Sequence, residues 1–353
     1  QEALSLLGAE APQLLVLGTP PHAAVDGAVT LVADQPVYRG LVNAVLRKLA
    51  RGGGGHLGGE DPHRLATPSW LWDSWVATYG EAQTRDIVEA HWREPALDLT
   101  IKEDIPYWAA RLNGEKVGKC TIRLRDAGPI EEIPGFESGA WWVQDAAATM
   151  AALALGDVKD ARVIDLGAAP GGKTAQLAAA GARVTAVDRS QRRLARLREN
   201  LARLKLQAEI VAGDAGAWRP ASLADAVLLD APCTATGTIR RHPDVLHLKS
   251  PADVVAMTTL QDRLLDNAWL MLKPGGTLVY CTCSLQPEEG AVRVERLLAS
   301  AAPLARVPIA AHEVGAPAEA ITPAGDVRTL PCHWKEAGGL DGFYIARLRR
   351  TQS

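Results

Sequence analysis

Long apolar runs are missing from this sequence, because no stretch approaches the roughly 18 consecutive apolar residues of a membrane-spanning helix. The N-terminus also lacks the charged, apolar and small-residue order of a secretory signal. Both absences predict a cytoplasmic protein that makes no membrane contact. Because the first residue is Gln1 rather than Met, we also expect a further segment of the protein to precede it.

Cysteine is scarce in this chain. The 353 residues include 5 cysteines, an odd number, which argues against a disulfide framework and favours reduced thiols. No two cysteines are spaced as CxxC, and His242 is the only histidine close in sequence to Cys233, so the sequence predicts no metal site. Thiol chemistry is therefore available to this protein.

A strong net charge is absent as well. The chain has 38 Lys and Arg against 41 Asp and Glu, a net charge of −3. Any contacts with nucleic-acid phosphates must therefore come from local basic patches. Residues 38–51, YRGLVNAVLRKLAR, place apolar residues at helical spacing and basic residues on other faces. This pattern predicts an amphipathic helix whose basic face either contacts RNA or is solvated.

Composition divides the chain into segments. Residues 51–63 contain six glycines and one proline, too flexible for the interior of a helix or strand, and they predict a linker that we place at 56–67. Residues 68–138 predict a Trp-rich helical connector followed by a small α+β segment. Residues 139–353 form the last and largest predicted domain.

Strand-like and helix-like segments alternate in this last domain. Apolar runs typical of strands are ARVIDL, ARVTAVD, AEIVAGD, ADAVLLD and GTLVYCTC. Residues 190–206 keep leucines three and four apart behind a capping serine, which predicts a crossover helix, and GFYIARLRR predicts a final strand. The alternation predicts an α/β fold of the Rossmann-like kind with a parallel sheet.

A glycine-rich turn, GAAPGGKT at residues 167–174, follows the first of these strands. It satisfies the phosphate-loop pattern GxxxxGKT, with Asp230 as a candidate magnesium ligand, so an ATPase is one interpretation. Pro170 argues against it, because proline lacks a backbone N–H that such a loop needs to hold phosphates. A dinucleotide site is disfavoured because Ala169 stands where GxGxxG requires its second glycine.

Three aspartates at strand ends favour a nucleoside pocket instead. Asp188 ends the strand about 20 residues past the loop, where a carboxylate can accept hydrogen bonds from ribose hydroxyls. Asp214 and Asp230 end the following strands, and Asp214 can lie beside an adenine edge. A pocket rich in carboxylates suits S-adenosylmethionine, which carries a sulfonium cation and no phosphate. For each aspartate alone, a turn or cap is the alternative.

Two segments with cysteines also follow strands: DAPCTATGTIRRHPD at residues 230–244 and YCTCS at residues 280–284. Together with DLGAAPGGKT, VTAVD, AGDA and the continuation LVYCTCSLQPEEG, they closely resemble the RNA cytosine-5 methyltransferases of the NOL1/NOP2/Sun family. Within that family, the bacterial enzymes of 16S ribosomal RNA are the most similar. The resemblance is most specific across residues 140–290. It implies a class I methyltransferase domain that binds S-adenosyl-L-methionine and no metal.

The resemblance implies roles for individual residues. Cys283 of the TCS motif resembles the nucleophile, Cys233 of the APC motif resembles a helper in product release, and Asp230 resembles a hydrogen-bond partner of the cytosine ring. Cytosine C5 is too poor a nucleophile to be methylated until a thiolate adds at C6, and a thiolate also leaves readily afterwards. The implied cofactor-binding residues are Gly167, Ala168, Ala169, Pro170, Gly171, Gly172, Lys173, Asp188, Asp214 and Asp230.

Spacing alone leaves the nucleophile undecided. Cys281 and Cys283 share a face of a regular strand, and Pro232 with Cys233 also matches the Pro-Cys of DNA cytosine methyltransferases. Those enzymes typically follow Pro-Cys with Gln, where this chain has Thr234, and they lack a second cysteine in a TCS motif. RNA is therefore favoured over DNA as the substrate.

The RNA contacts implied by the resemblance are Arg240, Arg241 and His242, which match the RRHPD of the family, and Lys102. An ion-paired loop clamp is the alternative for the first three. By the same resemblance, residues 1–55 are part of a NusB-like RNA-binding domain. We expect a monomer that acts on single-stranded or splayed small-subunit ribosomal RNA. The competing classes are an ATPase and an RNA-binding module without activity.

Overall fold

The computed structural model describes residues 20–32, 36–52 and 61–351, which form two compact units. The first unit runs to Arg93 and includes Arg241–Ser250; the second comprises Glu94–Arg240 and Pro251–Ser353. The small α+β segment thus belongs to the same unit as the α/β domain. Much of the predicted NusB-like segment and of the linker, at residues 1–19, 33–35 and 53–60, lies outside the described residues.

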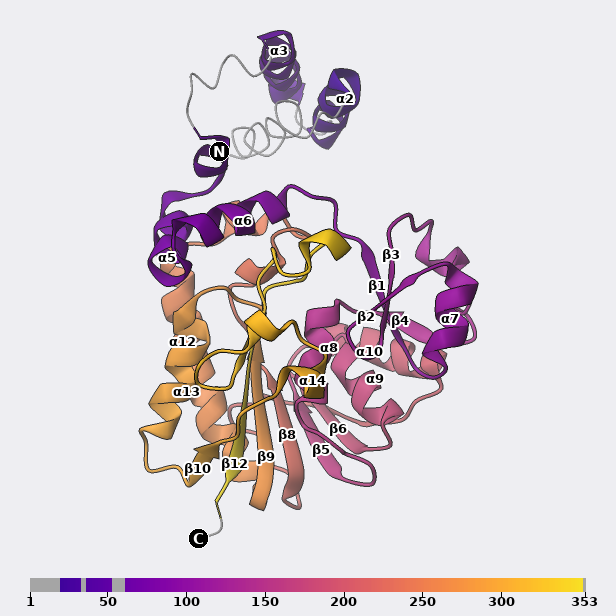
Figure 1. Ribbon diagram of the computed structural model, residues 1–353, viewed down its shortest axis with the longest axis vertical. Helices are drawn as coiled ribbons and strands as arrows, with labels where there is room; N and C mark the ends of the chain where they lie inside the picture. Colours follow the sequence, from indigo (N-terminus) through magenta and orange to yellow (C-terminus); the bar gives the residue numbers. More distant parts are fainter. Residues whose placement is uncertain (1–19, 33–35, 53–60, 352–353) are drawn as a thin grey trace. The chain divides into compact units, whose positions relative to one another are not determined.

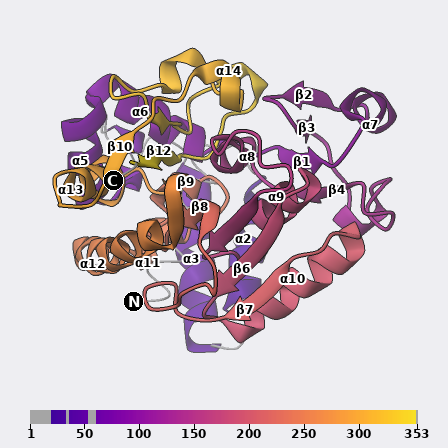
Figure 2. The same ribbon diagram turned by 90° about the horizontal axis from the view of Figure 1, so that it is seen from below.

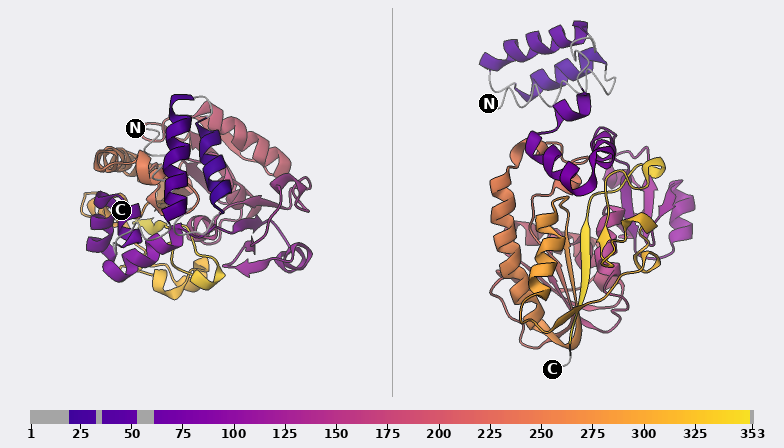
Figure 3. Two further views of the ribbon diagram at one scale, coloured as in Figure 1. Left: turned by 90° about the horizontal axis from the view of Figure 1, so that it is seen from above. Right: turned by 60° about the vertical axis from the view of Figure 1, so that its left-hand side comes forward.

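The described part of the first unit is helical. Its helices are α2 (Pro21–Leu31), α3 (Pro36–Gly52), α4 (Pro62–Ala66), α5 (Ser69–Tyr79), α6 (Glu81–His91) and α11 (Val245–Leu248). Helix α3 confirms the helix predicted for residues 38–51. Its apolar side chains Val42 and Leu46 are buried against Val25 of α2, and the two helices lie side by side in Figure 3.

A small antiparallel sheet opens the second unit. Its strands are β1 (Leu97–Ile101), β2 (Glu115–Val117), β3 (Thr121–Leu124) and β4 (Trp141–Val143), in the order β2-β3-β1-β4, with helix α7 (Ile105–Leu112) between β1 and β2. Leu99, Ile122 and Trp141 are buried in its core. This arrangement confirms the predicted small α+β segment.

A larger, mostly parallel sheet forms the centre of the second unit. Its order is β10-β12-β9-β8-β5-β6-β7, and β11 pairs with β12 outside this path. Neighbours from β9 to β7 are parallel, whereas β12 is antiparallel to β9 and β10. The strands are β5 (Arg162–Leu166), β6 (Arg183–Asp188), β7 (Glu209–Ala212), β8 (Ala224–Asp230), β9 (Leu272–Thr282), β10 (Leu304–Arg306), β11 (Val327–Arg328) and β12 (Tyr344–Arg350).

Helices cover both faces of this sheet (Figures 1 and 2). One face carries α8 (Ala146–Leu153), α9 (Gly172–Ala179) and α10 (Gln191–Leu204), and the other carries α12 (Pro251–Ala268) and α13 (Ala291–Leu298). The short α14 (Ala311–Val314) lies against α8. Successive side chains of each strand enter opposite cores, as the twofold strand period requires: Val163 packs under α8 and α9, and Ile164 under α12.

The predicted strands and the crossover helix are confirmed by β5 to β9, β12 and α10. Because β5, β6, β7, β8 and β9 are parallel, their carboxyl ends meet at one edge, where open α/β sheets bind ligands. The loops after these strands carry most of the predicted site residues. Within the described part of the chain, no helix is both long and apolar enough to span a membrane.

Candidate active site

The glycine-rich loop is held by strand β6. The N–H groups of Gly167 and Ala168 both donate to the carbonyl of Val187, at 2.9 and 3.2 Å. The N–H of Ala169 donates to Oδ2 of Asp188 at 3.2 Å. With Pro170 lacking an N–H, four consecutive residues offer no donor to a phosphate. This geometry argues against the ATPase interpretation.

Gly167 is required by a close approach of two strands. Its φ is +77°, and a Cβ at this position would lie 2.3 Å from the carbonyl oxygen of Asp230. Any larger residue would push β5 away from β8 or strain the backbone. The loop after β5 and the end of β8 therefore lie in direct contact.

Lys173 and Asp230 form a half-buried ion pair at the end of β8. Lys173 Nζ lies 2.8 Å from Asp230 Oδ2, and it also lies over the ring of Phe343, 5.4 Å from the centroid. Burial disfavours the charged form of Lys173, but the charge and hydrogen bond of Asp230, together with nearby Cys281 and Asp165, outweigh burial and raise the lysine pKa. Lys173 thus stays a cation, and its ammonium group is directed at the side chain of Asp230.

Asp188 and Asp214 line the same region but differ in exposure. Asp188 is 3% exposed and accepts from the N–H groups of Ala169 and Ser190, with Arg193 at 3.5 Å. Asp214 is half-exposed and pairs with Arg263, which holds its pKa below the usual range. Their carboxylates are fixed in place, so each can offer its remaining lone pairs in a defined direction.

The three cysteines near the carboxyl ends of β8 and β9 differ in their surroundings: Cys281 is buried, whereas Cys233 and Cys283 face each other. Cys281 lies inside β9, fully buried, and its sulfur is 3.6 Å from Asp230 Oδ1. Burial raises its pKa well above the ordinary value. Cys283 follows the end of β9, and its sulfur lies 3.5 Å from that of Cys233. The structure thus distinguishes Cys281 from Cys283, which spacing alone could not.

The loops that carry the two facing thiols are tied together. Gly237, in the turn η3 (Thr236–Thr238), donates its N–H to the carbonyl of Cys283 at 2.9 Å. The hydroxyl of Thr236 accepts from the N–H of Leu285 at 2.9 Å. A Cβ at Gly237 would lie 1.9 Å from the carbonyl oxygen of Gly342, so only glycine fits. These contacts therefore contribute to the fixed distance between the sulfurs.

One cavity brings these residues together. It measures about 260 Å³, and both facing thiols and all three predicted aspartates line it. Gly167 and Gly213 contribute backbone, and Leu260 and Leu264 of α12 contribute an apolar wall. The set fits S-adenosylmethionine, because carboxylates suit hydroxyls and a sulfonium, and an apolar wall suits an adenine ring.

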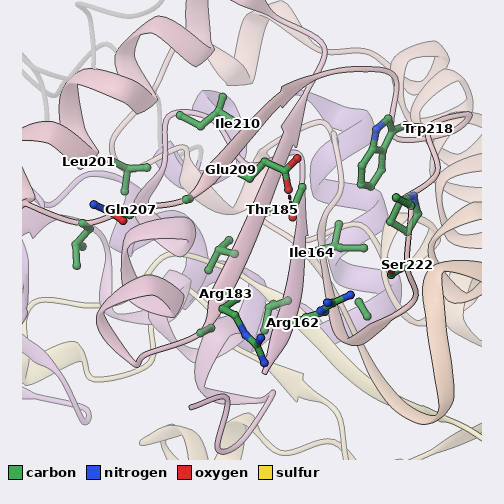
Figure 4. A pocket seen from close by; sticks show the side chains of 18 of the residues that line it. Arg162, Ile164, Arg183, Thr185, Leu201, Gln207, Glu209, Ile210, Trp218 and Ser222 are labelled. Atoms are coloured by element: carbon green, nitrogen blue, oxygen red, sulfur yellow. Dashed lines mark hydrogen bonds between the residues drawn. The ribbon is translucent and has the colours of Figure 1, made fainter. Parts of the chain in front are cut away.

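A larger cavity of about 980 Å³ lies elsewhere on the sheet and holds none of the predicted site residues (Figure 4). It borders β5, β6 and β7 beside the connection from β7 to β8, which contains no helix. In Figure 4, Arg162 and Arg183 lie at one end, and Thr185 donates to Glu209 at 2.8 Å in the middle. Size alone therefore does not identify the active site.

A family model described as 16S rRNA methyltransferase RsmB/F matches residues 152–349, more than half of the chain. This chain belongs to that rRNA methyltransferase family. The matched region contains the glycine loop, the three aspartates and both facing thiols.

Individual relatives agree with the RsmB/F assignment. The ribosomal RNA small subunit methyltransferase B of Pasteurella multocida (strain Pm70) is 37% identical over 363 residues, covering 97% of this chain and 78% of the relative. A methyltransferase homolog protein from Pyrococcus horikoshii is 26% identical with a TM-score of 0.67, covering 81% of this chain and 96% of that one. The crystal structure of PH0851 has a TM-score of 0.78 at 24% identity over 96% of this chain and 80% of that one. The predicted Rossmann-like methyltransferase fold is confirmed.

In this RsmB/F chain, the structure contradicts the RNA contact predicted for Arg240. Arg240 is 5% exposed, and its guanidinium donates to Asp341 and Asp145, each at 2.7 Å, and to the carbonyl of Gly338. A buried arginine is stable only when such partners replace its hydration. Arg240 therefore acts as an ion-paired clamp that joins the segment after Cys233 to Asp145 and Asp341. The Arg240 side chain is 2% exposed, so its guanidinium does not face solvent where RNA could bind.

The RNA contacts predicted for Arg241, His242 and Lys102 remain predictions. Arg241 and His242 lie in the segment Arg241–Ser250, which belongs to the first unit. Lys102 is half-buried and donates to the carbonyl of Leu204 at the end of α10, at 3.2 Å.

Several residues of this RsmB/F site escape sequence reasoning. Arg193 and Arg263 line the cavity as partners of Asp188 and Asp214. Asp165 of β5 is fully buried, accepts from Thr174 at 2.6 Å, and has a pKa raised to about 7 by burial. Arg263 lies 49 residues from its partner, so no local pattern could have joined them. Among the described residues, no cluster of His, Cys, Asp or Glu is arranged to hold a metal.

Proposed function

We propose that this protein methylates carbon 5 of cytosine in 16S ribosomal RNA, with S-adenosylmethionine as the methyl donor. The observation that carries the proposal is the pair of thiols, 3.5 Å apart, on the wall of a cavity that also contains the three strand-end aspartates. Methylation of an exocyclic nitrogen or a ribose oxygen needs no thiol. Methylation at C5 needs one, because the ring must first be activated by addition at C6.

The proposed reaction assigns a step to each thiol. The Cys283 thiolate adds to C6 of cytosine, which places a negative charge on the ring and makes C5 nucleophilic. When bound, S-adenosylmethionine would supply the methyl group from its sulfonium and be left as S-adenosylhomocysteine. The C5 proton then passes to solvent, its bonding electrons restore the C5–C6 double bond, and the Cys283–C6 bond breaks to return the Cys283 thiolate, a release that Cys233 assists. The base must be unstacked, since the thiolate approaches C6 from one face of the ring.

Asp230 and Lys173 support the base rather than react with it. The Asp230 carboxylate is about one-third exposed toward the cavity and can accept a hydrogen bond from the cytosine amino group. Lys173 keeps that carboxylate oriented through a hydrogen bond of 2.8 Å to Oδ2. On the cofactor side, Asp188 and Asp214 hold hydroxyl and base edges, and the loop Gly167–Lys173 holds the amino-acid portion. As part of the same proposal, the protein acts as a monomer in the cytoplasm. Arg241, His242 and Lys102 contact the RNA.

The product tests this proposal. Purified protein is incubated with unmodified 16S ribosomal RNA and S-adenosylmethionine, and the RNA is digested to nucleosides for mass spectrometry. We expect 5-methylcytidine among the nucleosides, and none with Cys283→Ala. Methylation of another atom would overturn the C5 assignment. Equilibrium binding separates the ATPase class, because S-adenosylmethionine should bind without magnesium and ATP should not. An inactive RNA-binding module would bind RNA but form no product.

A further inference from the structure

Glu289 is a buried acid that the reaction above does not use. It ends the short turn η5 (Pro287–Glu289) after the TCS motif and is fully buried. A carboxylate removed from water is costly unless several hydrogen bonds replace its hydration. Its surroundings therefore need an explanation.

Four donors converge on this carboxylate. Oε1 accepts from the N–H of Thr234 at 2.9 Å and from Nε2 of Gln261 at 3.2 Å. Oε2 accepts from the hydroxyl of Ser284 at 2.5 Å and from the hydroxyl of Thr234. Because all four partners donate, the arrangement suits an ionised carboxylate, which only accepts.

Two of the three donor residues directly follow the reactive thiols in sequence. Thr234 is the residue after Cys233, and Ser284 is the residue after Cys283. The backbone carbonyl of Glu289 also accepts from the hydroxyls of Tyr280 and Thr282, at 2.7 and 3.3 Å. One residue thus joins the two thiol loops to each other and to the end of β9.

We propose that Glu289 is a positioning residue that fixes the two thiols against each other and keeps Cys233 in its protonated form while Cys283 reacts. The proposal rests on the proposed function. A protonated Cys233 can donate to the sulfur of Cys283, and it holds the proton needed when product leaves.

The charges around Cys233 agree with this order. Its pKa is raised well above the ordinary value by the hydrogen bond with Cys283, by burial, and by the negative charges of Cys283 and Glu289. Removing the charge of Glu289 should therefore make Cys233 easier to ionise. A purely structural buried acid would affect folding without this directed effect.

The test compares Glu289→Gln with Glu288→Gln. Glu288 is the adjacent acid of the same turn and is exposed, so it is a matched control. The rate of Cys233 alkylation by iodoacetamide is measured against pH in the free protein by peptide mass spectrometry. In this reaction the thiolate forms the sulfur–carbon bond and iodide leaves.

We expect Glu289→Gln to lower the midpoint pH of Cys233 alkylation by about one unit, and Glu288→Gln to leave it unchanged. Glu289→Asp keeps the charge and should hold the midpoint near that of the unaltered protein. In the transfer assay, Glu289→Gln should lower kcat by about 10- to 100-fold with the RNA KM within about twofold. An unchanged midpoint would overturn the proposal.

Two outcomes need separate interpretations. If Glu289→Gln does not unfold cooperatively, Ser284→Ala takes its place, since it removes one donor only; a kcat equal to that of the unaltered protein would then overturn the proposal. If the midpoint shifts but the unaltered protein makes no 5-methylcytidine, the coupling of the thiols holds and the proposed function fails.

Discussion

The two walls of the active-site cavity are built by different means. The cofactor wall, Gly167–Lys173 with Asp188, is held by backbone N–H groups and by a glycine pressed against β8. The thiol wall, which carries Cys233 and Cys283, is held largely by buried side chains, and the pairs Glu289–Thr234 and Arg240–Asp145 join residues 55 and 95 apart in the sequence. A wall built from backbone is readable in the sequence as glycines and strand ends, whereas a wall built from side-chain pairs is not.

Removing the clamp of the thiol wall should have the largest effect on stability. Arg240→Ala leaves Asp145 and Asp341 buried without their main cationic partner. We expect the free energy of unfolding to fall by about 3–5 kcal/mol in urea titrations. Arg192→Ala, at an exposed position on α10, is the control and should cost less than about 0.5 kcal/mol. Equal stabilities would show that the ion pairs do not hold this wall.

A substitution in the cofactor wall should lower the free energy of unfolding somewhat less than Arg240→Ala does. Gly167→Ala introduces a Cβ at 2.3 Å from a carbonyl oxygen, together with an unfavourable φ of +77°. We expect a loss of about 3 kcal/mol and weaker binding of S-adenosylmethionine by calorimetry. Gly156→Ala is a matched control, because its φ is +78° with nothing within 4 Å, so it reports the backbone strain alone. The same loss in both variants would exclude the clash.

Asp165, beneath the cofactor wall, predicts a pH dependence. Its pKa is raised to about 7 by burial in the folded state, against about 3.9 in an unfolded chain. The folded state therefore binds more protons between these values, and stability falls as pH rises from about 4 to 7. Asp165→Asn should remove this loss. The difference in free energy of unfolding between the variant and the unaltered protein should be more favourable to the variant at pH 8 than at pH 4, by on the order of 2–4 kcal/mol. Parallel stability profiles would contradict the raised pKa.

The comparison also explains what sequence could predict. The alternating apolar runs, the leucine spacing of α10 and the glycine loop fixed the parallel sheet and the cofactor edge, because these depend on local periodicity. The choice between Cys281 and Cys283 depends on where β9 ends, one residue beyond Cys281, and came only from the family resemblance. Arg240 looked like an RNA contact because its partners lie 95 and 101 residues away.

The most direct test of the account traps the covalent step. Cys233→Ala, Cys283→Ala and Cys281→Ala are each incubated with S-adenosylmethionine and unmodified 16S ribosomal RNA, then run on a denaturing gel. The account predicts a stable protein–RNA adduct with Cys233→Ala, neither adduct nor product with Cys283→Ala, and near-normal transfer with Cys281→Ala. An adduct that forms with Cys283→Ala would contradict the assignment of Cys283 as the nucleophile.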